Sequence, residues 1–321
     1  MSLGYDRRFV KMPGRGWIHG ADDGKYNHMR TGMMEKETKG KTLLGITGSY
    51  RKKGNSELVI RAMARSLGRE DDLELIRLAS LDIRPCKGCY ACLLPGVSCN
   101  IKDDMEWLLE QMARAGALIF AVPDYVLGPV GILKMAADRA LQAGRYHAVF
   151  KKIPVVAALT LGREDYRGYA DTALISQVSA LGFRVLGLGI FHGTHPGEAV
   201  LGDGFADRIE GLARPLADGI VMPPQPGRCP RCHSDLFRVR NGKLECALCK
   251  AEGTLEGEDI SFSRFPREFS PEGLMEHMKW LLMKKQEFAG MRDRLRAVQD
   301  EYGPGRWLMP ERDSVDADAG R

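Results

Sequence analysis

The chain has 321 residues, of which 44% are hydrophobic and 28% charged, and its formal net charge is +5. This is the composition of a globular protein, and so small an excess of positive charge does not demand a nucleic-acid partner. No run reaches the ~18 apolar residues of a membrane span, and no secretory signal core is found near the start, so we expect a cytoplasmic protein with reduced thiols.

Residues 1–40 show no clear periodicity, and frequent glycines would interrupt any helix there, so we expect an N-terminal arm. At residue 42 the pattern changes to the apolar run TLLGIT, residues 42–47. Such a short apolar run predicts a strand that is buried on both faces of a parallel sheet.

A polar, glycine-containing loop at residues 48–56 follows this strand and leads into a helical pattern. Backbone N–H groups at such a loop and at the helix N-terminus favour a phosphate. Ser49, Asn55 and Ser56 could add hydrogen bonds, and Arg51 could pair with the anion or lie in solvent. The alternative is an ordinary helix cap without a ligand.

A second strand is predicted at residues 73–78, and a cysteine loop at residues 86–99 comes soon after it. This loop holds four of the eight cysteines at the spacing C-x2-C-x2-C-x6-C. They are Cys86, Cys89, Cys92 and Cys99. Closely spaced thiolates of this kind are typical of a cubane 4Fe-4S cluster. The alternatives are zinc held by the same thiolates, or two disulfides.

Three further apolar strands alternate with helical segments. They are predicted at residues 117–122, 154–159 and 183–190. The alternation predicts an α/β fold with a doubly wound, five-stranded parallel sheet, in which ligands gather at the carboxyl ends of the strands. The loops at 48–56, 86–99 and 123–131 should therefore lie at one edge. His192 and His195 follow the fifth strand and could reach this edge, although ordinary loop histidines are the simpler interpretation.

A proline-rich linker begins a region, residues 222–262, that we interpret as a zinc ribbon. Two Cys-x2-Cys pairs flank a predicted hairpin with Asn241-Gly242 as its turn. The four cysteines are Cys229, Cys232, Cys246 and Cys249. A single rubredoxin-like iron is the competing interpretation. A nucleic-acid role is disfavoured because Lys and Arg are not concentrated here.

The segment 263–303 is predicted to hold a long amphipathic helix that starts at Ser270-Pro271. Its apolar residues recur three, four or seven positions apart, with charges of both signs between them. Packing on its own domain or on a partner subunit is therefore favoured over membrane binding. Residues 304–321 form a polar tail.

Three motifs together resemble the iron-sulfur flavoprotein branch of the NADPH-dependent FMN reductase family. They are the segment GITGSYRKKGNS at residues 45–56, the compact cysteine loop, and Pro123-Asp124-Tyr125 with Leu133-Lys134 and Asp138-Arg139. The similarity covers roughly residues 41–215. It implies a flavodoxin-like FMN-binding domain at residues 41–221 and a homodimer or a dimer of dimers.

The resemblance also implies positions for the cofactor. The FMN phosphate would fall to Ser49, Arg51, Asn55 and Ser56. The isoalloxazine ring would pack on the loop after the third strand. The implied ring contacts are Pro123, Tyr125, Val126 and Gly128. A third, loosely matching contact loop lies near residues 160–162. Asp124 stands where the family has an apolar residue, and Val126 where an aromatic is frequent.

These features predict an FMN-dependent oxidoreductase that passes electrons between a reduced donor, NAD(P)H or ferredoxin, and an acceptor through FMN and a 4Fe-4S cluster. No acid-base pair or Ser-His-Asp arrangement occurs at convincing spacing. The alternative is a zinc-binding regulatory or structural protein in which both cysteine quartets hold zinc. The predicted partners are redox donors and acceptors, which are small molecules or carrier proteins.

Overall fold

The computed structural model describes residues 9–12, 15–19, 42–94, 96–223, 225–257, 259–266 and 271–301. Most of the predicted N-terminal arm and the tail at 304–321 lie outside these residues. Within the arm, β1 (Phe9–Met12) and β2 (Arg15–His19) pair as an antiparallel hairpin. Residues 1–279 and 280–321 are separate compact units.

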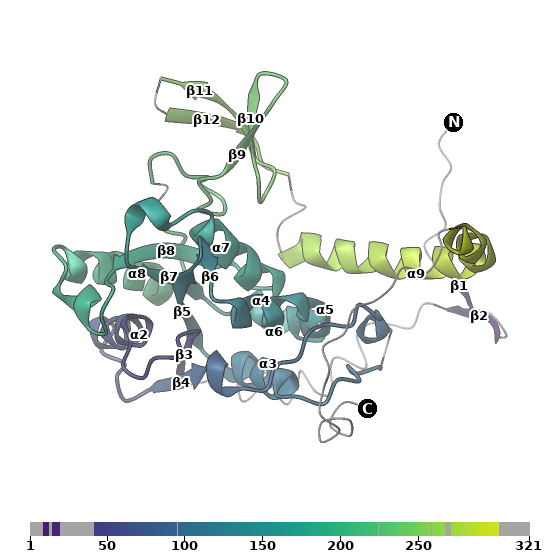
Figure 1. Ribbon diagram of the computed structural model, residues 1–321, viewed down its shortest axis with the longest axis horizontal. Coiled ribbons are helices and arrows are strands. Elements are labelled where there is room, and N and C mark those ends of the chain that lie inside the picture. The colour runs from purple at the N-terminus through teal and green to yellow at the C-terminus, as the bar shows by residue number, and fades with distance from the viewer. Residues whose placement is uncertain are drawn as a thin grey trace. The chain divides into compact units, whose positions relative to one another are not determined.

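Five parallel strands form the main sheet, in the spatial order β4-β3-β5-β7-β8 (Figure 1). They are β3 (Leu43–Thr47), β4 (Leu73–Arg77), β5 (Ala117–Tyr125), β7 (Val155–Leu161) and β8 (Val185–His192). The order is that of a flavodoxin-like sheet, with a switch point between β3 and β5. The predicted fold class and the five parallel strands are confirmed.

A sixth strand was not predicted. β6 (Gly128–Pro129) turns back after β5 and pairs with it antiparallel, so that Tyr125 lies opposite Gly128. β5 itself continues to Tyr125, whereas the apolar pattern ends at residue 122. The extra residues carry polar and aromatic side chains to the edge of the sheet, which is where a site is expected.

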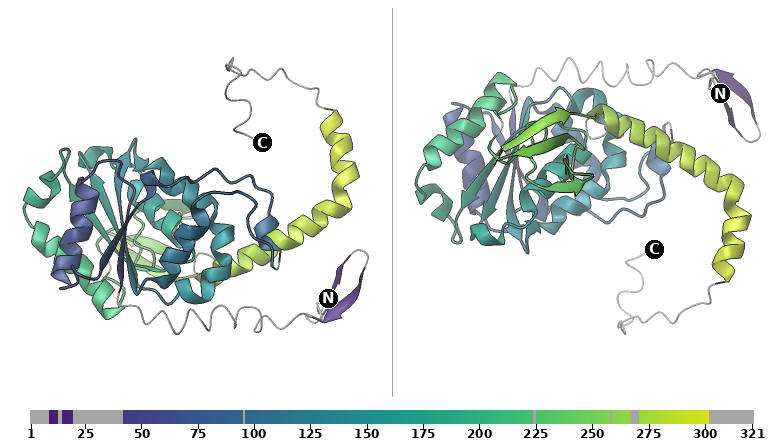
Figure 2. Two further views of the ribbon diagram at one scale, coloured as in Figure 1. Left: turned by 90° about the horizontal axis from the view of Figure 1, so that it is seen from below. Right: turned by 90° about the horizontal axis from the view of Figure 1, so that it is seen from above.

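Helices cover both faces of the sheet (Figure 2). α2 (Asn55–Ser66) and α8 (Phe205–Asp218) pack on one face with Leu43, Ile119 and Val156. The opposite face is covered by the other helices. They are α3 (Met105–Arg114), α4 (Gly131–Asp138), α5 (Ala140–Ala143), α6 (His147–Phe150) and α7 (Ala170–Ala180). Because both faces are covered, strands such as β3 and β7 are apolar at nearly every position.

A small antiparallel sheet follows the linker, with the order β12-β11-β10-β9. Its strands are β9 (Phe237–Arg240), β10 (Lys243–Cys246), β11 (Glu252–Glu256) and β12 (Asp259–Arg264). Asn241 and Gly242 have φ values of 50° and 73°, which is the left-handed backbone that a type I′ turn requires. The predicted hairpin is confirmed, and a second hairpin, β11 with β12, extends it.

The long helix is α9 (Pro271–Asp300), and it begins at the predicted Pro271. Two of its large apolar side chains, Met283 and Phe288, are each 53% exposed. In the described part of the chain, no helix combines the length and the apolar character needed to cross a membrane.

Candidate functional site

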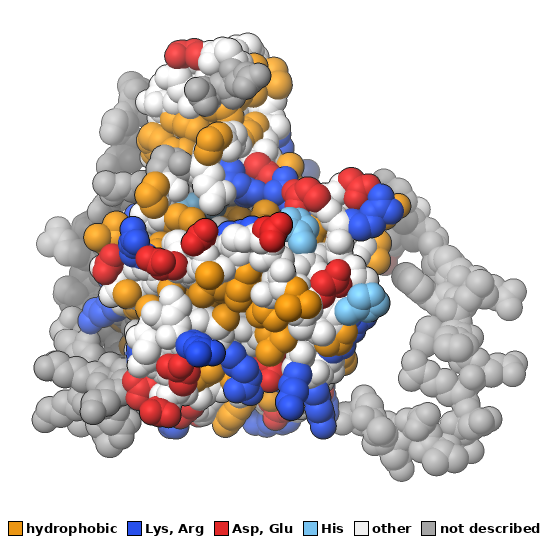
Figure 3. All heavy atoms as spheres, turned by 90° about the vertical axis from the view of Figure 1, so that its left-hand side faces the viewer, with side chains coloured by type: hydrophobic (Ala, Val, Ile, Leu, Met, Phe, Trp, Pro, Cys, Tyr) orange, Lys and Arg blue, Asp and Glu red, His pale blue; other side chains and the backbone are white. Residues whose placement is uncertain are grey.

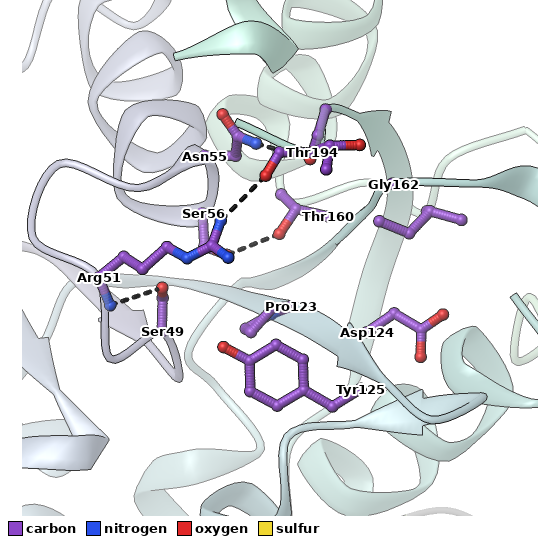
Figure 4. Close-up of a pocket in the computed structure, with 12 residues that line it drawn as sticks. Ser49, Arg51, Asn55, Ser56, Pro123, Asp124, Tyr125, Thr160, Gly162 and Thr194 are labelled. Atoms are coloured by element: carbon purple, nitrogen blue, oxygen red, sulfur yellow. Dashed lines mark hydrogen bonds between the residues drawn. The ribbon is translucent and has the colours of Figure 1, made fainter. Parts of the chain in front are cut away.

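A cavity of about 180 Å³ opens at the carboxyl ends of β3, β5, β7 and β8 (Figure 4). It is lined by Ser49, Arg51, Asn55, Ser56, Pro123, Asp124, Tyr125, Thr160, Leu161, Gly162, Gly193 and Thr194. Four segments far apart in the sequence meet here, as the parallel sheet predicts. Six of the eight residues predicted to contact a cofactor lie on its wall, together with the third loop near residue 160.

The loop between β3 and α2 forms one wall. The N–H of Ser49 donates to Thr47 Oγ1 at 3.2 Å, and the N–H of Arg51 donates to Ser49 Oγ at 3.2 Å. α2 then begins at Asn55, and its N-cap, Gly54, supplies no side-chain hydrogen bond to the first turn. Asn55 and Ser56, the first residues of the helix, line the cavity, and a helix N-terminus without a side-chain cap is an arrangement that can bind an anion.

Arg77, at the end of β4, supports this loop from behind. Its Nη1 donates to the carbonyl oxygens of Ser49 at 2.8 Å and Arg51 at 2.7 Å, and its Nη2 pairs with Glu57 at 2.8 Å. Burial acts to raise the pKa of the Glu57 carboxyl, but hydrogen bonds from Lys53 N–H and from arginines outweigh it and lower that pKa. Sequence patterns miss Arg77 because it is one arginine at the end of an ordinary strand.

The side chain of Asn55 makes hydrogen bonds within the protein. Its Nδ2 donates to Gly193 O at 2.8 Å, and its Oδ1 accepts from Gly197 N–H at 2.9 Å. The side chain thus holds the loop after β8 against the start of α2. Ser56 Oγ likewise lies 2.8 Å from Thr160 Oγ1 and joins α2 to β7.

The loop between β5 and β6 forms the opposite wall, where Pro123 and Tyr125 line the cavity. Val126 and Gly128 were also predicted to contact the ring, but neither is among the residues that line the cavity. Val126 is 93% exposed with a φ of 56°, and Gly128 lies against the ring of Tyr169. Figure 3 shows hydrophobic side chains gathered in the middle of the face at the left of Figure 1.

The first cysteine quartet lies in an open loop, and the described residues of this loop contain one regular element, the short 3-10 turn Ala91–Leu93. Cys86 and Cys89 are exposed, and Cys92 and Cys99 are partly buried. Burial raises the pKa of the Cys92 thiol, and the neighbouring Cys99, Cys86 and Cys89 raise it further. Cys92 is therefore near enough to the other three cysteines of the loop to be affected by their charge.

The second quartet is far more compact. Cys229, Cys232, Cys246 and Cys249 are buried, and their sulfur atoms lie within 4.8 Å of one another. This spacing suits one metal ion with four thiolates, whereas a cubane spreads its ligands over four irons. Among the described residues this is the group assembled closely enough to hold a single metal ion.

The sequence of this chain is similar to a known protein family and to curated proteins. The family model described as NADPH-dependent FMN reductase matches residues 42–195. An iron-sulfur flavoprotein of Archaeoglobus fulgidus is 36% identical over 173 residues, which cover 50% of this chain and 81% of that protein. A second, from Methanosarcina thermophila, is 36% identical over 133 residues, or 40% of this chain and 68% of that protein. The chain belongs to the iron-sulfur flavoprotein branch of the FMN reductase family.

A solved structure supports the fold assignment of this iron-sulfur flavoprotein. A flavone reductase superposes with a TM-score of 0.58 and 19% identity, over 84% of this chain and 100% of that chain. The iron-sulfur flavoprotein is an FMN-dependent oxidoreductase with an iron-sulfur cluster. The alternative of a zinc-binding regulatory protein is not favoured. FMN accepts a hydride and releases electrons singly, which suits it to a one-electron cluster.

Asp124 is an acidic residue on the wall of the cavity. Figure 4 shows its side chain pointing away from Tyr125, and its Oδ1 is buried with no hydrogen-bond partner among the described residues. Burial raises the pKa of the Asp124 carboxyl to about 6; a bond from Gly128 N–H opposes this, and the charge of Asp171 adds to it.

This shift makes stability depend on pH. A carboxyl whose pKa is raised on folding binds its proton more tightly in the folded chain, so stability is lost as pH rises from about 4 to about 6. Asp124→Asn should therefore gain more stability relative to wild type at pH 7.5 than at pH 4.5, which lies near the start of this window. We expect about 1 kcal/mol in urea unfolding of FMN-free protein, because solvent screens the partly exposed group. An equal difference at both pH values would contradict the assignment.

Proposed function

We propose that this protein takes electrons from NAD(P)H or reduced ferredoxin and passes them through FMN and a 4Fe-4S cluster to an acceptor. The observation that carries the proposal is the uncapped N-terminus of α2 in the cavity at the sheet edge. That wall offers amides and Arg51 to a phosphate, while Pro123 and Tyr125 offer an apolar surface to a flat ring. The donor set therefore fits FMN.

In this proposal the phosphate is bound by the loop residues Ser49, Arg51 and Ser56 and by the first amides of α2. Arg51 already donates through Nη1 to Thr194 O at 2.9 Å, so its guanidinium is held at the cavity mouth. Asn55 is proposed to act chiefly by holding the 193–199 loop. Val126, in the β5–β6 turn, and Gly128, at the start of β6, remain proposed contacts of the isoalloxazine ring.

The cluster is assigned to Cys86, Cys89, Cys92 and Cys99, because these cysteines share one loop at a spacing typical of a cubane, and two of them are exposed. The second quartet is assigned to zinc. Four buried thiolates around one point match a structural zinc site, and such a site supplies folding energy to a small unit.

The proposal also includes the division of the chain into an arm, an FMN-binding domain, a ribbon, a long helix and a tail. A homodimer or homotetramer is proposed, with the exposed apolar side chains of α9 as support. We place the protein in the cytoplasm, since none of the eight cysteines forms a disulfide and a reducing compartment keeps clustered cysteines available as metal ligands.

The first test is chemical analysis of anaerobically purified protein. We expect about four irons, four sulfides, one FMN and one zinc per chain. Bleaching of the flavin absorbance by NADH, NADPH or reduced ferredoxin then identifies the donor. Two zincs and no sulfide would refute the redox proposal, and about five irons without zinc would reassign the ribbon to a single iron.

The phosphate assignment predicts an effect of Arg77, which does not line the cavity. Arg77→Met should free the carbonyl groups of Ser49 and Arg51 and disorder the loop, which should weaken FMN binding about tenfold. The measurement is fluorescence titration of FMN-free protein with FMN. Arg69→Met is the matched control, because Arg69 pairs with Asp72 before β4. Equal affinities for wild type and Arg77→Met would contradict the loop assignment.

A further inference from the structure

Behind the cysteine loop lies a buried cation. The side chains of Arg139 and Asp103 are each 1% exposed, and they form an ion pair at 2.6 Å. Arg139 follows α4, the helix that starts immediately after the β5–β6 turn. A buried arginine is costly unless its donors are satisfied, so its remaining contacts indicate what the position is for.

The guanidinium of Arg139 is fixed on several sides. Nη1 also donates to Arg84 O at 3.0 Å, and Nη2 donates to Gln142 Oε1 at 2.9 Å. Nη2 lies 3.4 Å from Cys99 Sγ as well, within hydrogen-bond distance for sulfur. Gln142 in turn donates to Glu106 Oε2 at 2.8 Å. The planar group therefore cannot turn away from the thiol.

One donor is left over. Arg139 Nε is buried and has no hydrogen-bond partner among the described residues. Buried N–H groups without a partner are rare, because each forfeits the hydrogen bond that it would make in water. An acceptor at this position would remove the penalty, and the sulfur atoms of a cluster on Cys99 are acceptors of that kind.

We propose that Arg139 is a positioning residue that donates hydrogen bonds to the Cys99 thiolate and the bound cluster, and so raises the cluster's reduction potential. The inference rests on the proposed assignment of the cluster to the loop cysteines. Hydrogen bonds to sulfur and nearby positive charge favour the reduced, more negative state. The buried site strengthens both effects, because water does not screen them.

The test compares midpoint potentials by EPR-monitored redox titration. Arg139→Met alone would strand the buried Asp103, so it is combined with Asp103→Asn. We expect the double variant still to bind the cluster. Its equilibrium constant for one-electron reduction of the cluster should be tenfold lower, which is a shift of the midpoint potential by about 59 mV to lower potential. Arg145→Gln is the control: Arg145 lies beside the same loop, contacts Ser98 Oγ and pairs with Glu106, and neither partner is a thiol. An unchanged potential in the double variant, or an equal shift in the control, would overturn the proposal.

A second measurement begins with the wild-type protein. In protein labelled with ¹⁵N-arginine, pulsed EPR of the reduced cluster should detect a ¹⁵N coupling, and Arg139→Lys should abolish it. Absence of the coupling from wild type overturns the inference. Iron and sulfide analysis of the same sample tells a failure of the proposed function from a failure of the role given to Arg139. Wild-type protein without a cluster refutes the proposed function, whereas a cluster without the ¹⁵N coupling refutes only the role of Arg139.

Discussion

Replacing Cys89 with serine should abolish the broad visible absorption of the cluster and leave the FMN spectrum in place. A serine oxygen is a poor substitute for a soft thiolate, so about four irons and four sulfides per chain should be lost together. Flavin should remain, because Cys89 is not among the residues that line the cavity. The measurement is the absorption spectrum with iron, sulfide and flavin analysis of anaerobically purified variant.

The result should also separate flavin reduction from onward electron transfer. Cys89→Ser should still have its flavin bleached by the donor that reduces wild type, while transfer to a one-electron acceptor should fall by orders of magnitude. The control is Val97→Ser, which changes an exposed residue of the same loop that carries no thiol and should leave the cluster intact. Survival of the broad absorption in Cys89→Ser would falsify the ligand assignment.

The second large effect is expected in the ribbon. Its buried core consists of Cys229, Cys232, Cys246, Cys249 and Ala251, with three partly buried apolar residues packed against it. A core of four thiols holds together only around a metal. Cys246→Ser should therefore release about one metal ion per chain and unfold the ribbon, making residues 225–266 sensitive to protease.

The domain that contains the parallel sheet should also lose stability. Arg228 Nη2 pairs at 2.7 Å with Asp171 on α7, a residue with 0% exposure. Thr172 and Ser234 hydroxyls lie 2.9 Å apart across the same contact. When the ribbon unfolds, Arg228 no longer pairs with Asp171. An unpaired buried carboxylate lowers the free energy of unfolding by about 3 kcal/mol. Arg167, 3.6 Å from Asp171, should recover part of this.

Differential scanning calorimetry and limited proteolysis would measure both consequences. The matched control is Val239→Ser, since Val239 lies on β9 of the same ribbon but is 76% exposed. It should retain the metal and the wild-type melting temperature. A Cys246→Ser protein with a protease-resistant ribbon and an unchanged melting temperature would show that the quartet is not a structural metal site.

Much of this protein can be predicted from local sequence. The apolar runs at β3, β5 and β7 indicate strands buried on both faces, because only a sheet covered by helices on each side accepts an unbroken apolar strand. The cysteine spacings indicate two metal centres, because few other structures need thiols so close together. The Asn-Gly turn of the ribbon follows from the left-handed backbone that it requires.

The supporting residues were decided only in three dimensions. Arg77 hydrogen-bonds residues of the β3–α2 loop that are 26 and 28 positions away in the sequence. Arg139 contacts Cys99, which is 40 positions away. Nothing in a local pattern distinguishes such an arginine from one on the surface, because its role depends on which backbone carbonyls and thiols the fold brings to it. Local pattern determines backbone conformation and ligand type, whereas burial and long-range pairing, which set charge and potential, arise only when the sheet is assembled.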